Sequence, residues 1–406
     1  MAVGLKPLSN LHPVSGVSIG VAQAGIKYAN RNDVTLFKLC EGATVASVFT
    51  QNRFCAAPVI VAKKHLSSMA PAYFLVNTGN ANAGTGEAGK QASLACCAAV
   101  ASLAHCRVEQ VLPFSTGVIG ESLEVDKITA VLQAAFDNLR EDNWLVAASA
   151  IMTTDTLPKG YSTQIELGGE IVTITGISKG SGMIRPDMAT MLAYVATDAQ
   201  VEQDLLQSLL SKANSVSFNA ITVDGDTSTN DACLLVATGK KAVSLDQHSD
   251  SALLETFYQA LEETLKYLAQ SIIRDGEGAT KFISVKVENG KDVGECEKVA
   301  YAIAHSPLVK TAFFASDPNW GRILAAVGRA GIDDLAIDNL TIKLNDVLIV
   351  ENGSRAKHYS ERKGQAVMDQ DEICICVDLG RGKATHTIWT TDFSYDYVKI
   401  NAEYRT

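Results

Sequence analysis

The segment from Lys179 to Asp198, KGSGMIRPDMATMLAYVATD, combines residue types that could support nucleophilic catalysis. Gly180 and Gly182 permit backbone angles that other residues avoid, and Pro186 restricts the chain ahead of an Ala-Thr step. An apolar run follows that step directly. We therefore expect the loop to hold one peptide bond, Ala189–Thr190, in a fixed geometry.

A chain cut before Thr190 would place a free α-amine beside the hydroxyl of the same residue. An α-amine has a pKa near ~7.7–8.0, so it can accept the hydroxyl proton and activate the oxygen as a nucleophile. Gly-Ser-Gly turns are also common in ordinary loops. From spacing alone, a plain glycine-rich turn into a buried strand is the alternative.

The same segment resembles the self-cleavage segment of the ornithine acetyltransferase family, the bifunctional glutamate N-acetyltransferases of arginine biosynthesis. Further blocks of the family pattern follow in order along the whole chain. These blocks are FTQNRF at 49–54, NTGNANAGTG at 77–86, STGVIGE at 115–121, TTDT at 153–156, VDGDTSTND at 223–231, RDGEGATKF at 274–282, DPNWGRI at 317–323 and INAEYRT at 400–406. Because so many ordered blocks match, the chain is identified as a member of that family.

The resemblance implies an α/β fold, an α-β-β-α layered sandwich of the D-aminopeptidase and ornithine acetyltransferase kind, with a smaller second domain. It also implies that the chain cuts itself into two. Residues 1–189 would form an α chain, and residues 190–406 would form a β chain that begins with the nucleophile. Two copies of each chain would form a heterotetramer.

The catalytic groups that the resemblance implies are Thr190 as nucleophile and Thr116 with Gly117 as oxyanion hole. Attack on an amide produces a negative oxygen, and the loss of one donor to that oxygen typically costs roughly 10²–10³ in rate. Thr116 and Gly117 offer a hydroxyl, two backbone N–H groups and a glycine that permits close approach. From these residues alone, an ordinary strand-ending turn is the alternative.

The resemblance also implies a set of substrate-binding residues, and two of them carry charges that suit the substrates. An ammonium at Lys179 could bind a substrate carboxylate, and the carboxylate of Glu277 could meet the ornithine side-chain ammonium. A solvated lysine and an exposed Asp-Gly-Glu-Gly turn are the alternatives from sequence alone. The full set is Thr153, Lys179, Thr190, Glu277, Asn401 and Thr406.

The implied reaction moves acetyl from N2-acetylornithine to glutamate through an acetyl-Thr190 intermediate, which gives ornithine and N-acetylglutamate. Acetyl-CoA is left open as a second donor, which would make the enzyme an amino-acid N-acetyltransferase as well. The first alternative is a self-processed N-terminal-threonine amidohydrolase or aminopeptidase that uses water in place of glutamate. The second is a non-enzymatic binder of small anions, which would stay uncut.

The composition argues against several other classes of protein. A net charge of −10 argues against nucleic acid as a partner, and the longest apolar run, about 13 residues, is too short to span a bilayer. The nine cysteines lack zinc-type spacing, which favours reduced thiols in a cytoplasmic enzyme. The acidic block at 224–235 fails the calcium pattern, with Thr229 sixth and Leu235 twelfth. We therefore expect no metal and no cofactor.

The elements that would position these residues alternate irregularly, which favours layered sheets over a doubly wound one. Helical spacing of apolar residues predicts helices over 87–105, 126–139, 203–213, 253–273 and 300–315. Apolar and alternating runs predict strands over 34–49, 57–62, 74–76, 171–177, 192–197, 281–287, 372–378 and 386–390, with a hairpin over 335–350.

Overall fold

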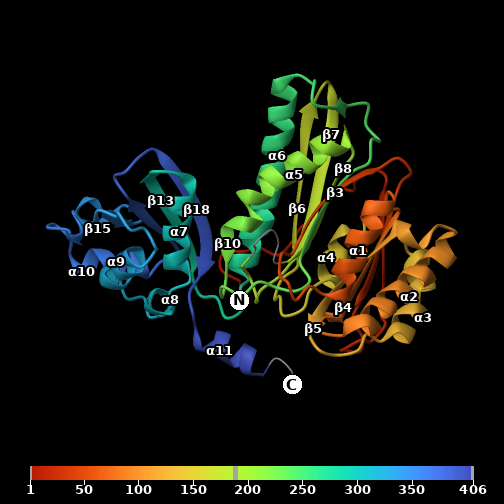
Figure 1. Cartoon of the computed structure of the whole chain (residues 1–406), viewed down its shortest axis with the longest axis horizontal. Helices are drawn as coiled ribbons and strands as arrows, with labels where there is room; N and C mark the ends of the chain where they lie inside the picture. Colours follow the sequence, from red (N-terminus) through yellow and green to blue (C-terminus); the bar gives the residue numbers. More distant parts are fainter. Residues whose placement is uncertain (1, 186–190, 404–406) are drawn as a thin grey trace. The chain divides into compact units, whose positions relative to one another are not determined.

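The computed structural model describes residues 2–185 and 191–403 of the 406-residue chain. The chain divides into two compact units, each with its own sheets and helices (Figure 1). The larger unit comprises Pro7–Asn219 and Thr227–Ile272. The smaller unit comprises Met1–Lys6, Ala220–Asp226 and Ile273–Thr406.

Two sheets form the centre of the larger unit. The strand order of the first sheet is β1 (Val17–Ala22), β2 (Val34–Leu39), β4 (Tyr73–Asn80), β5 (Val111–Val118). The strand order of the second sheet is β3 (Thr44–Phe49), β11 (Ala232–Ala237), β8 (Leu192–Thr197), β7 (Glu170–Lys179), β6 (Lys159–Leu167). Two short strands, β9 (Gln200–Val201) and β12 (Ser244–Leu245), pair separately. The two main sheets share one apolar core. In it, the rings of Phe37 from β2 and Tyr194 from β8 stack with centroids 4.8 Å apart. The sheets therefore pack face to face.

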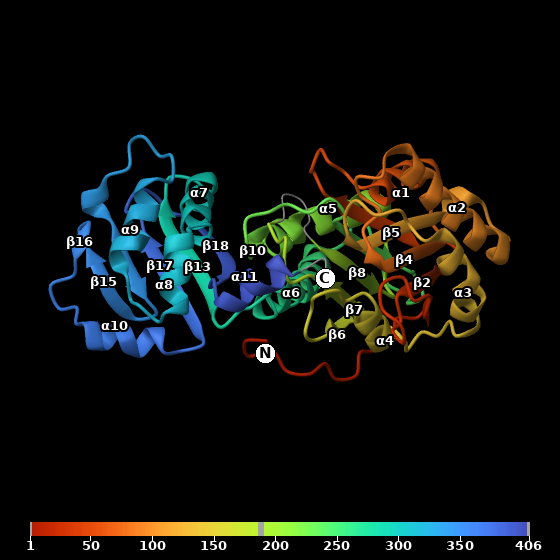
Figure 2. The same ribbon diagram turned by 90° about the horizontal axis from the view of Figure 1, so that it is seen from below.

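Helices cover the outer face of each sheet (Figures 1 and 2). On the first sheet, α2 (Gly86–Ala104) and α3 (Val125–Asp137) share a core with β1, β2, β4 and β5. On the second sheet, α5 (Gln203–Ser215) packs against β3, and α6 (Ser251–Arg274) lies close to β7. Between the layers, α4 (Trp144–Ala150) contributes to the core of the two sheets. This arrangement is the α-β-β-α sandwich, so the fold prediction is confirmed.

The smaller unit contains one mixed sheet of seven strands. Their order is β10 (Ile221–Thr222), β18 (Ala384–Thr391), β13 (Phe282–Gly290), β17 (Glu372–Asp378), β14 (Thr341–Leu344), β15 (Val347–Glu351), β16 (Ser354–Arg355). The unit also contains α7 (Val293–Ala304), α8 (Pro307–Phe314), α9 (Trp320–Gly328), α10 (Glu361–Met368) and α11 (Tyr395–Ala402). All of these helices except α11 contribute to one buried core with the sheet.

Three of the predicted elements differ from the structure. The run over 34–49, expected as strand, is divided between β2 and β3, which belong to different sheets. Residues 57–62 were expected to form a strand, but they begin the helix α1 (Ala57–Ser68), which has Pro58 in its first turn and packs against β5 and α2. The apolar run there suits a buried helix face as well as a strand. Residues 300–315 were expected to form one helix. They are divided between α7 and α8, because the Ser306 side chain caps a new helix that starts at Pro307.

The expected cut between residues 189 and 190 falls inside the larger unit and not between the two units. On either side of it, β7 and β8 pair antiparallel, with Lys179 opposite Leu192. Two fragments produced by such a cut would therefore stay joined by a strand ladder. In the part of the chain that the structure describes, no helix is long and apolar enough to cross a membrane.

Candidate active site

Two of the predicted site residues, Thr116 and Lys179, meet in the larger unit. Thr116 lies near the end of β5, and Lys179 is the last residue of β7. The Lys179 Nζ donates a hydrogen bond to Thr116 Oγ1 at 3.1 Å. The two residues belong to different sheets, so this bond joins the two central layers at the candidate oxyanion site.

Gly117 lies where β5 approaches β4 most closely. Its φ is +136°, a value that residues with a side chain rarely adopt. A Cβ atom added there would lie 2.2 Å from the carbonyl carbon of Gly79 and 2.5 Å from the nitrogen of Asn80. The close approach expected of Gly117 is therefore one between two backbones, and any larger residue would push the strands apart.

Amide side chains fix the end of β5 just before Thr116. The Ser115 hydroxyl donates to Asn77 Oδ1 at 2.5 Å, and Asn77 Nδ2 donates to the Asn80 carbonyl at 2.8 Å. From the block at 223–231, Asn230 Nδ2 donates to the Ser115 carbonyl at 2.9 Å. Asn77 and Asn230 were not singled out from the sequence, although both lie in matched blocks. Their side chains hold the backbone that presents Thr116.

A buried ion pair, Asp155 with Lys159, fixes the beginning of the loop that leads to the Ala-Thr step. Asp155 Oδ1 accepts from Lys159 Nζ at 2.6 Å and from the Gly180 N–H at 2.8 Å. Its Oδ2 accepts from the backbone N–H of Thr153 at 2.9 Å. Both side chains of the pair are completely buried. The predicted substrate residue Thr153 is therefore part of the network that holds Gly180.

The charges around Asp155 keep its carboxyl ionised. Burial by itself would raise the pKa of Asp155, but the ammonium groups of Lys159 and Lys179 and the hydrogen bonds outweigh it. The net effect lowers the pKa of Asp155 well below its usual range. Sequence reasoning missed Asp155 and Lys159 as a pair, although the TTDT block contains the aspartate.

In the smaller unit, Glu277 and Asn401 meet although 124 positions separate them. Asn401, on α11, donates from Nδ2 to Glu277 Oε2 at 2.8 Å. The loop that carries Glu277 is held closely to the start of α11, because the Ser394 hydroxyl donates to the Gly278 carbonyl at 2.6 Å. Glu277 is only 6% exposed. The loop is therefore not the exposed turn that the sequence left as an alternative.

Three of the predicted site residues, Ala189, Thr190 and Thr406, lie outside the described residues. The nearest described residue after the expected cut is Met191, which is buried and accepts a hydrogen bond at its carbonyl from the Ala232 N–H at 2.9 Å. Over residues 2–185 and 191–403, no three His, Cys, Asp or Glu side chains are grouped so as to hold a metal ion.

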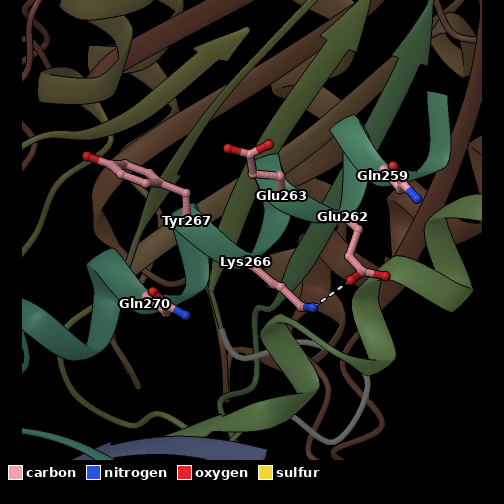
Figure 3. A pocket seen from close by; sticks show the side chains of 6 residues that line it. All are labelled: Gln259, Glu262, Glu263, Lys266, Tyr267 and Gln270. Atoms are coloured by element: carbon pink, nitrogen blue, oxygen red, sulfur yellow. Dashed lines mark hydrogen bonds and ion pairs between the residues drawn. The ribbon is translucent and has the colours of Figure 1, made fainter. Parts of the chain in front are cut away.

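Two surface hollows in the larger unit lie apart from these residues. One, of about 310 Å³, is lined by Gly84, Thr85, Ala88, Gly89, Ala92, Gly120, Ser122 and Leu123. The other, of about 340 Å³, follows one side of α6 (Figure 3). Figure 3 shows Lys266 turned toward Glu262, which it meets at 2.5 Å. Neither hollow is lined by a residue that the sequence analysis assigned to the site.

Comparison with known proteins identifies the family. A sequence model of the ArgJ family matches residues 18–406, and the chain therefore belongs to the ArgJ family. The chain is 57% identical to the arginine biosynthesis bifunctional protein ArgJ of Pseudomonas fluorescens (strain Pf0-1) over 100% of both chains. It is 55% identical to the protein of that name from Pseudomonas syringae pv. tomato, again over 100% of both chains.

Two solved structures are also similar to this chain. The crystal structure of the arginine biosynthesis bifunctional protein ArgJ from Bacillus halodurans is 39% identical over 52% of this chain and 99% of that chain, with a TM-score of 0.50. A Mycobacterium tuberculosis structure, ornithine acetyltransferase complexed with ornithine, is 30% identical over 44% of this chain and 94% of that chain, with a TM-score of 0.38. The family model and the full-length relatives confirm the resemblance read from the sequence.

Proposed function

We propose that this protein is a self-processing acetyltransferase of arginine biosynthesis, which moves acetyl from N2-acetylornithine to glutamate through an acetyl-Thr190 intermediate. The observation that carries the proposal is the match to the ArgJ family over residues 18–406, with relatives 57% and 55% identical along their whole length. Those relatives are named as bifunctional arginine biosynthesis proteins. Their name favours the acetyltransferase over the aminopeptidase alternative.

In the proposed reaction, the α-amine of Thr190 accepts the proton of its own hydroxyl as the oxygen attacks the acetyl carbonyl. Collapse of the tetrahedral intermediate releases ornithine, which takes that proton. The α-amine of glutamate then attacks the acetyl-enzyme and regenerates the Thr190 hydroxyl. One amide is broken and another is formed, so the chemistry requires no cofactor.

The bond between Lys179 and Thr116 supports the assignment of Thr116 to the oxyanion hole. An ammonium group can only donate, so Thr116 Oγ1 is the acceptor in the 3.1 Å bond. The hydroxyl proton of Thr116 is then directed away from Lys179. A hydroxyl that accepts from a cation is a stronger donor, which suits a group that stabilises the developing negative charge. The Gly117 N–H would be the second donor.

The mature protein would consist of residues 1–189 and residues 190–406, which are 47% and 53% of the 406-residue chain. The Bacillus halodurans chain matches 52% of this chain with 99% of its own length. A related polypeptide of about half the length fits an enzyme that is cut near its middle. The ladder between β7 and β8 would hold the two fragments together after the cut.

For the substrates, we assign the carboxylates to Lys179 and the ornithine side-chain ammonium to Glu277, with Thr153, Asn401 and Thr406 as further contacts. Acetyl-CoA is included as a second acetyl donor, consistent with the bifunctional names of the relatives. The proposed assembly is a heterotetramer of two α and two β chains, and the proposed location is the cytoplasm.

Turnover by the purified protein tests this function. With N2-acetylornithine and glutamate together, ornithine and N-acetylglutamate should form in equal amounts. With N2-acetylornithine alone, intact mass should show one acetyl group on the fragment that begins at Thr190. Release of free acetate at the same rate without glutamate would instead identify a hydrolase. Acetyl-CoA in place of acetylornithine tests the second donor.

A further inference from the structure

The Ser394 hydroxyl joins the start of α11 to the loop that carries Glu277. Its oxygen accepts a hydrogen bond from the Tyr397 N–H at 3.2 Å, which makes Ser394 the N-cap of the helix. Its proton is donated to the Gly278 carbonyl at 2.6 Å. A cap needs only the lone pairs of the oxygen, so the bond to Gly278 is an additional contact, and it is made to the residue next to Glu277.

The backbone of the loop allows this contact because position 278 is a glycine. Gly278 has a φ of +67°, which residues with a side chain rarely adopt. A Cβ atom added there would lie 2.4 Å from the Tyr397 nitrogen and 2.5 Å from Ser394 Oγ. A larger residue would therefore separate α11 from the loop, and the close approach depends on the glycine as well as on the hydroxyl.

α11 holds Glu277 at a second point, through Asn401 in its last turn. Asn401 Nδ2 donates to Glu277 Oε2 at 2.8 Å and to the Tyr397 carbonyl at 3.0 Å. The Ser394 bond thus fixes the backbone beside Glu277, and the Asn401 bond fixes its carboxylate. Both bonds require α11 to keep its place against the loop.

α11 is attached through contacts at its surface. None of the residues Tyr395–Ala402 is buried. The Tyr397 ring stacks on the Phe393 ring with centroids 4.8 Å apart, and the Tyr397 hydroxyl lies 3.4 Å from Asp224 Oδ2. Because no buried side chain anchors the helix, the Ser394 bond is a substantial part of what keeps it against the Glu277 loop.

The far end of the same loop is fixed independently of Ser394. The Asp392 carboxylate accepts hydrogen bonds from the backbone N–H groups of Thr280 and Lys281, at 2.8 Å and 2.9 Å, just before β13 begins. Loss of the Ser394 hydroxyl would therefore loosen the part of the loop around Glu277 and leave its entry into the sheet in place.

The charges around the Tyr397 hydroxyl are negative. Burial raises the pKa of Tyr397, and nearby carboxylates raise it further. Those carboxylates belong to Asp224, Glu277 and Asp226. A region of this sign attracts an ammonium group and repels another carboxylate, so the position of Glu277 should matter more for the side chain of ornithine than for that of glutamate.

We propose that Ser394 is a positioning residue for N2-acetylornithine, an inference that rests on the proposed binding of the ornithine ammonium by Glu277. The Ser394 hydroxyl holds the loop against α11, and this contact keeps the Glu277 carboxylate where the ammonium binds. Ser394 acts through Glu277, so it affects the choice between the two substrates and not the acetyl transfer itself.

Steady-state kinetics of purified Ser394→Ala test this role. A covalent intermediate makes the reaction ping-pong, so kcat/KM for each substrate reports on its own half of the reaction. Loss of one neutral hydrogen bond corresponds to about 3- to 10-fold, and kcat/KM for N2-acetylornithine should fall by that factor. For glutamate, kcat/KM should stay within about twofold of the wild-type value. Ser394→Thr keeps a hydroxyl and should restore the wild-type ratio of the two values.

The matched control is Ser306→Ala, at the N-cap of α8 in the same unit. Ser306 is 6% exposed and Ser394 is 5% exposed, and the Ser306 hydroxyl accepts from the Val309 N–H at 3.4 Å. This variant removes a cap of the same kind and leaves the bond between Ser394 and Gly278 in place. It should keep the wild-type ratio of the two kcat/KM values, whereas a purely structural role of Ser394 predicts the same ratio for both alanine variants.

The outcomes separate this inference from the proposed function. If Glu277→Gln distinguishes the substrates and Ser394→Ala does not, the inference is overturned and the function stands. Should Ser394→Ala fail to fold, Gly278→Ala disturbs the same contact from the loop. An unchanged kcat/KM for N2-acetylornithine in Gly278→Ala would then overturn the inference, and a selective loss would support it. A wild-type protein that forms no N-acetylglutamate would refute the proposed function itself.

Discussion

The Lys179 ammonium and the Thr116 hydroxyl, from the two facing sheets of the sandwich, are joined by a 3.1 Å hydrogen bond. The ammonium also acts electrostatically on two buried carboxyls with opposite pKa shifts, Asp155 and Asp231. One cation thus donates to the hydroxyl of the candidate oxyanion hole and favours the ionised form of both carboxyls.

Thr116→Ala should lower kcat for acetyl transfer by on the order of 10²-fold and leave KM nearly unchanged, because an oxyanion donor acts mainly in the transition state. Steady-state kinetics with N2-acetylornithine and glutamate provide the measurement. Thr116→Ser keeps a hydroxyl and should retain most of the activity. A Thr116→Ala variant with raised KM and unchanged kcat would remove Thr116 from the oxyanion hole.

Glu277→Gln should weaken the binding of N2-acetylornithine more than the binding of glutamate, because only the ornithine side chain carries an ammonium group that Glu277 can attract. The substitution keeps the shape of the side chain. It also keeps an oxygen that can accept a hydrogen bond from Asn401 Nδ2, which lies 2.8 Å from Glu277 Oε2 in the wild-type protein. Separate KM values for the two substrates measure the effect. Lys179→Met is the comparison variant. Because both substrates have carboxylates, it should weaken the binding of both. Equal losses in Glu277→Gln would contradict the assigned division between the two residues.

The sequence predicts the long helices of this fold well and its buried charges poorly. α2, α3 and α6 have apolar residues at helical spacing over at least three turns, and all three were predicted near their observed bounds. Six residues are too few to separate a strand from the first turns of a helix, which explains the error at 57–62. The order of layers came from the family resemblance and not from periodicity.

The same limit of sequence-based prediction applies to single residues of the candidate site. Matched blocks pointed to Thr116, Lys179 and Glu277, which the structure places in two networks, one in each unit. The aspartates Asp155 and Asp231 stand in matched blocks too, but nothing local distinguishes a buried carboxyl from a solvated one. Burial and pairing are set by distant segments, and only the folded chain reveals them.

Purified active protein should appear as two fragments if the chain cuts itself between Ala189 and Thr190, as proposed above. By length, 189/406 and 217/406 of 43.2 kDa give about 20 and about 23 kDa. Sequencing of the larger fragment should begin Thr-Met-Leu-Ala. Thr190→Ala should remain whole and inactive, whereas Thr190→Ser should still cut because its hydroxyl can attack. Full activity from a single uncut band would exclude the scheme.

Asp155→Asn should destabilise the larger unit strongly at neutral pH, because it leaves the Lys159 ammonium buried without its counter-ion. Loss of one partner from a buried pair typically costs about 3–5 kcal/mol, and both side chains here are completely buried. Urea unfolding at pH 7 of the variant and of the wild type provides the measurement. Asp142→Asn, which removes the partner of Arg140 in a surface pair at 2.8 Å, is the matched control and should change stability little.

The pH dependence of this difference has a definite sign. The pKa of Asp155 is lowered in the folded protein, so its contribution to stability is fully present above the unfolded value of about 3.9. That contribution is lost as the pH falls from about 3.9 through the lowered pKa of the folded protein, because the carboxyl then becomes protonated in both the folded and the unfolded state. The stability gap between wild type and Asp155→Asn should therefore be constant from pH 7 to about pH 5 and narrow below about pH 4. A gap that is small at pH 7, or that widens in acid, would show that the ion pair of Asp155 and Lys159 does not stabilise the larger unit.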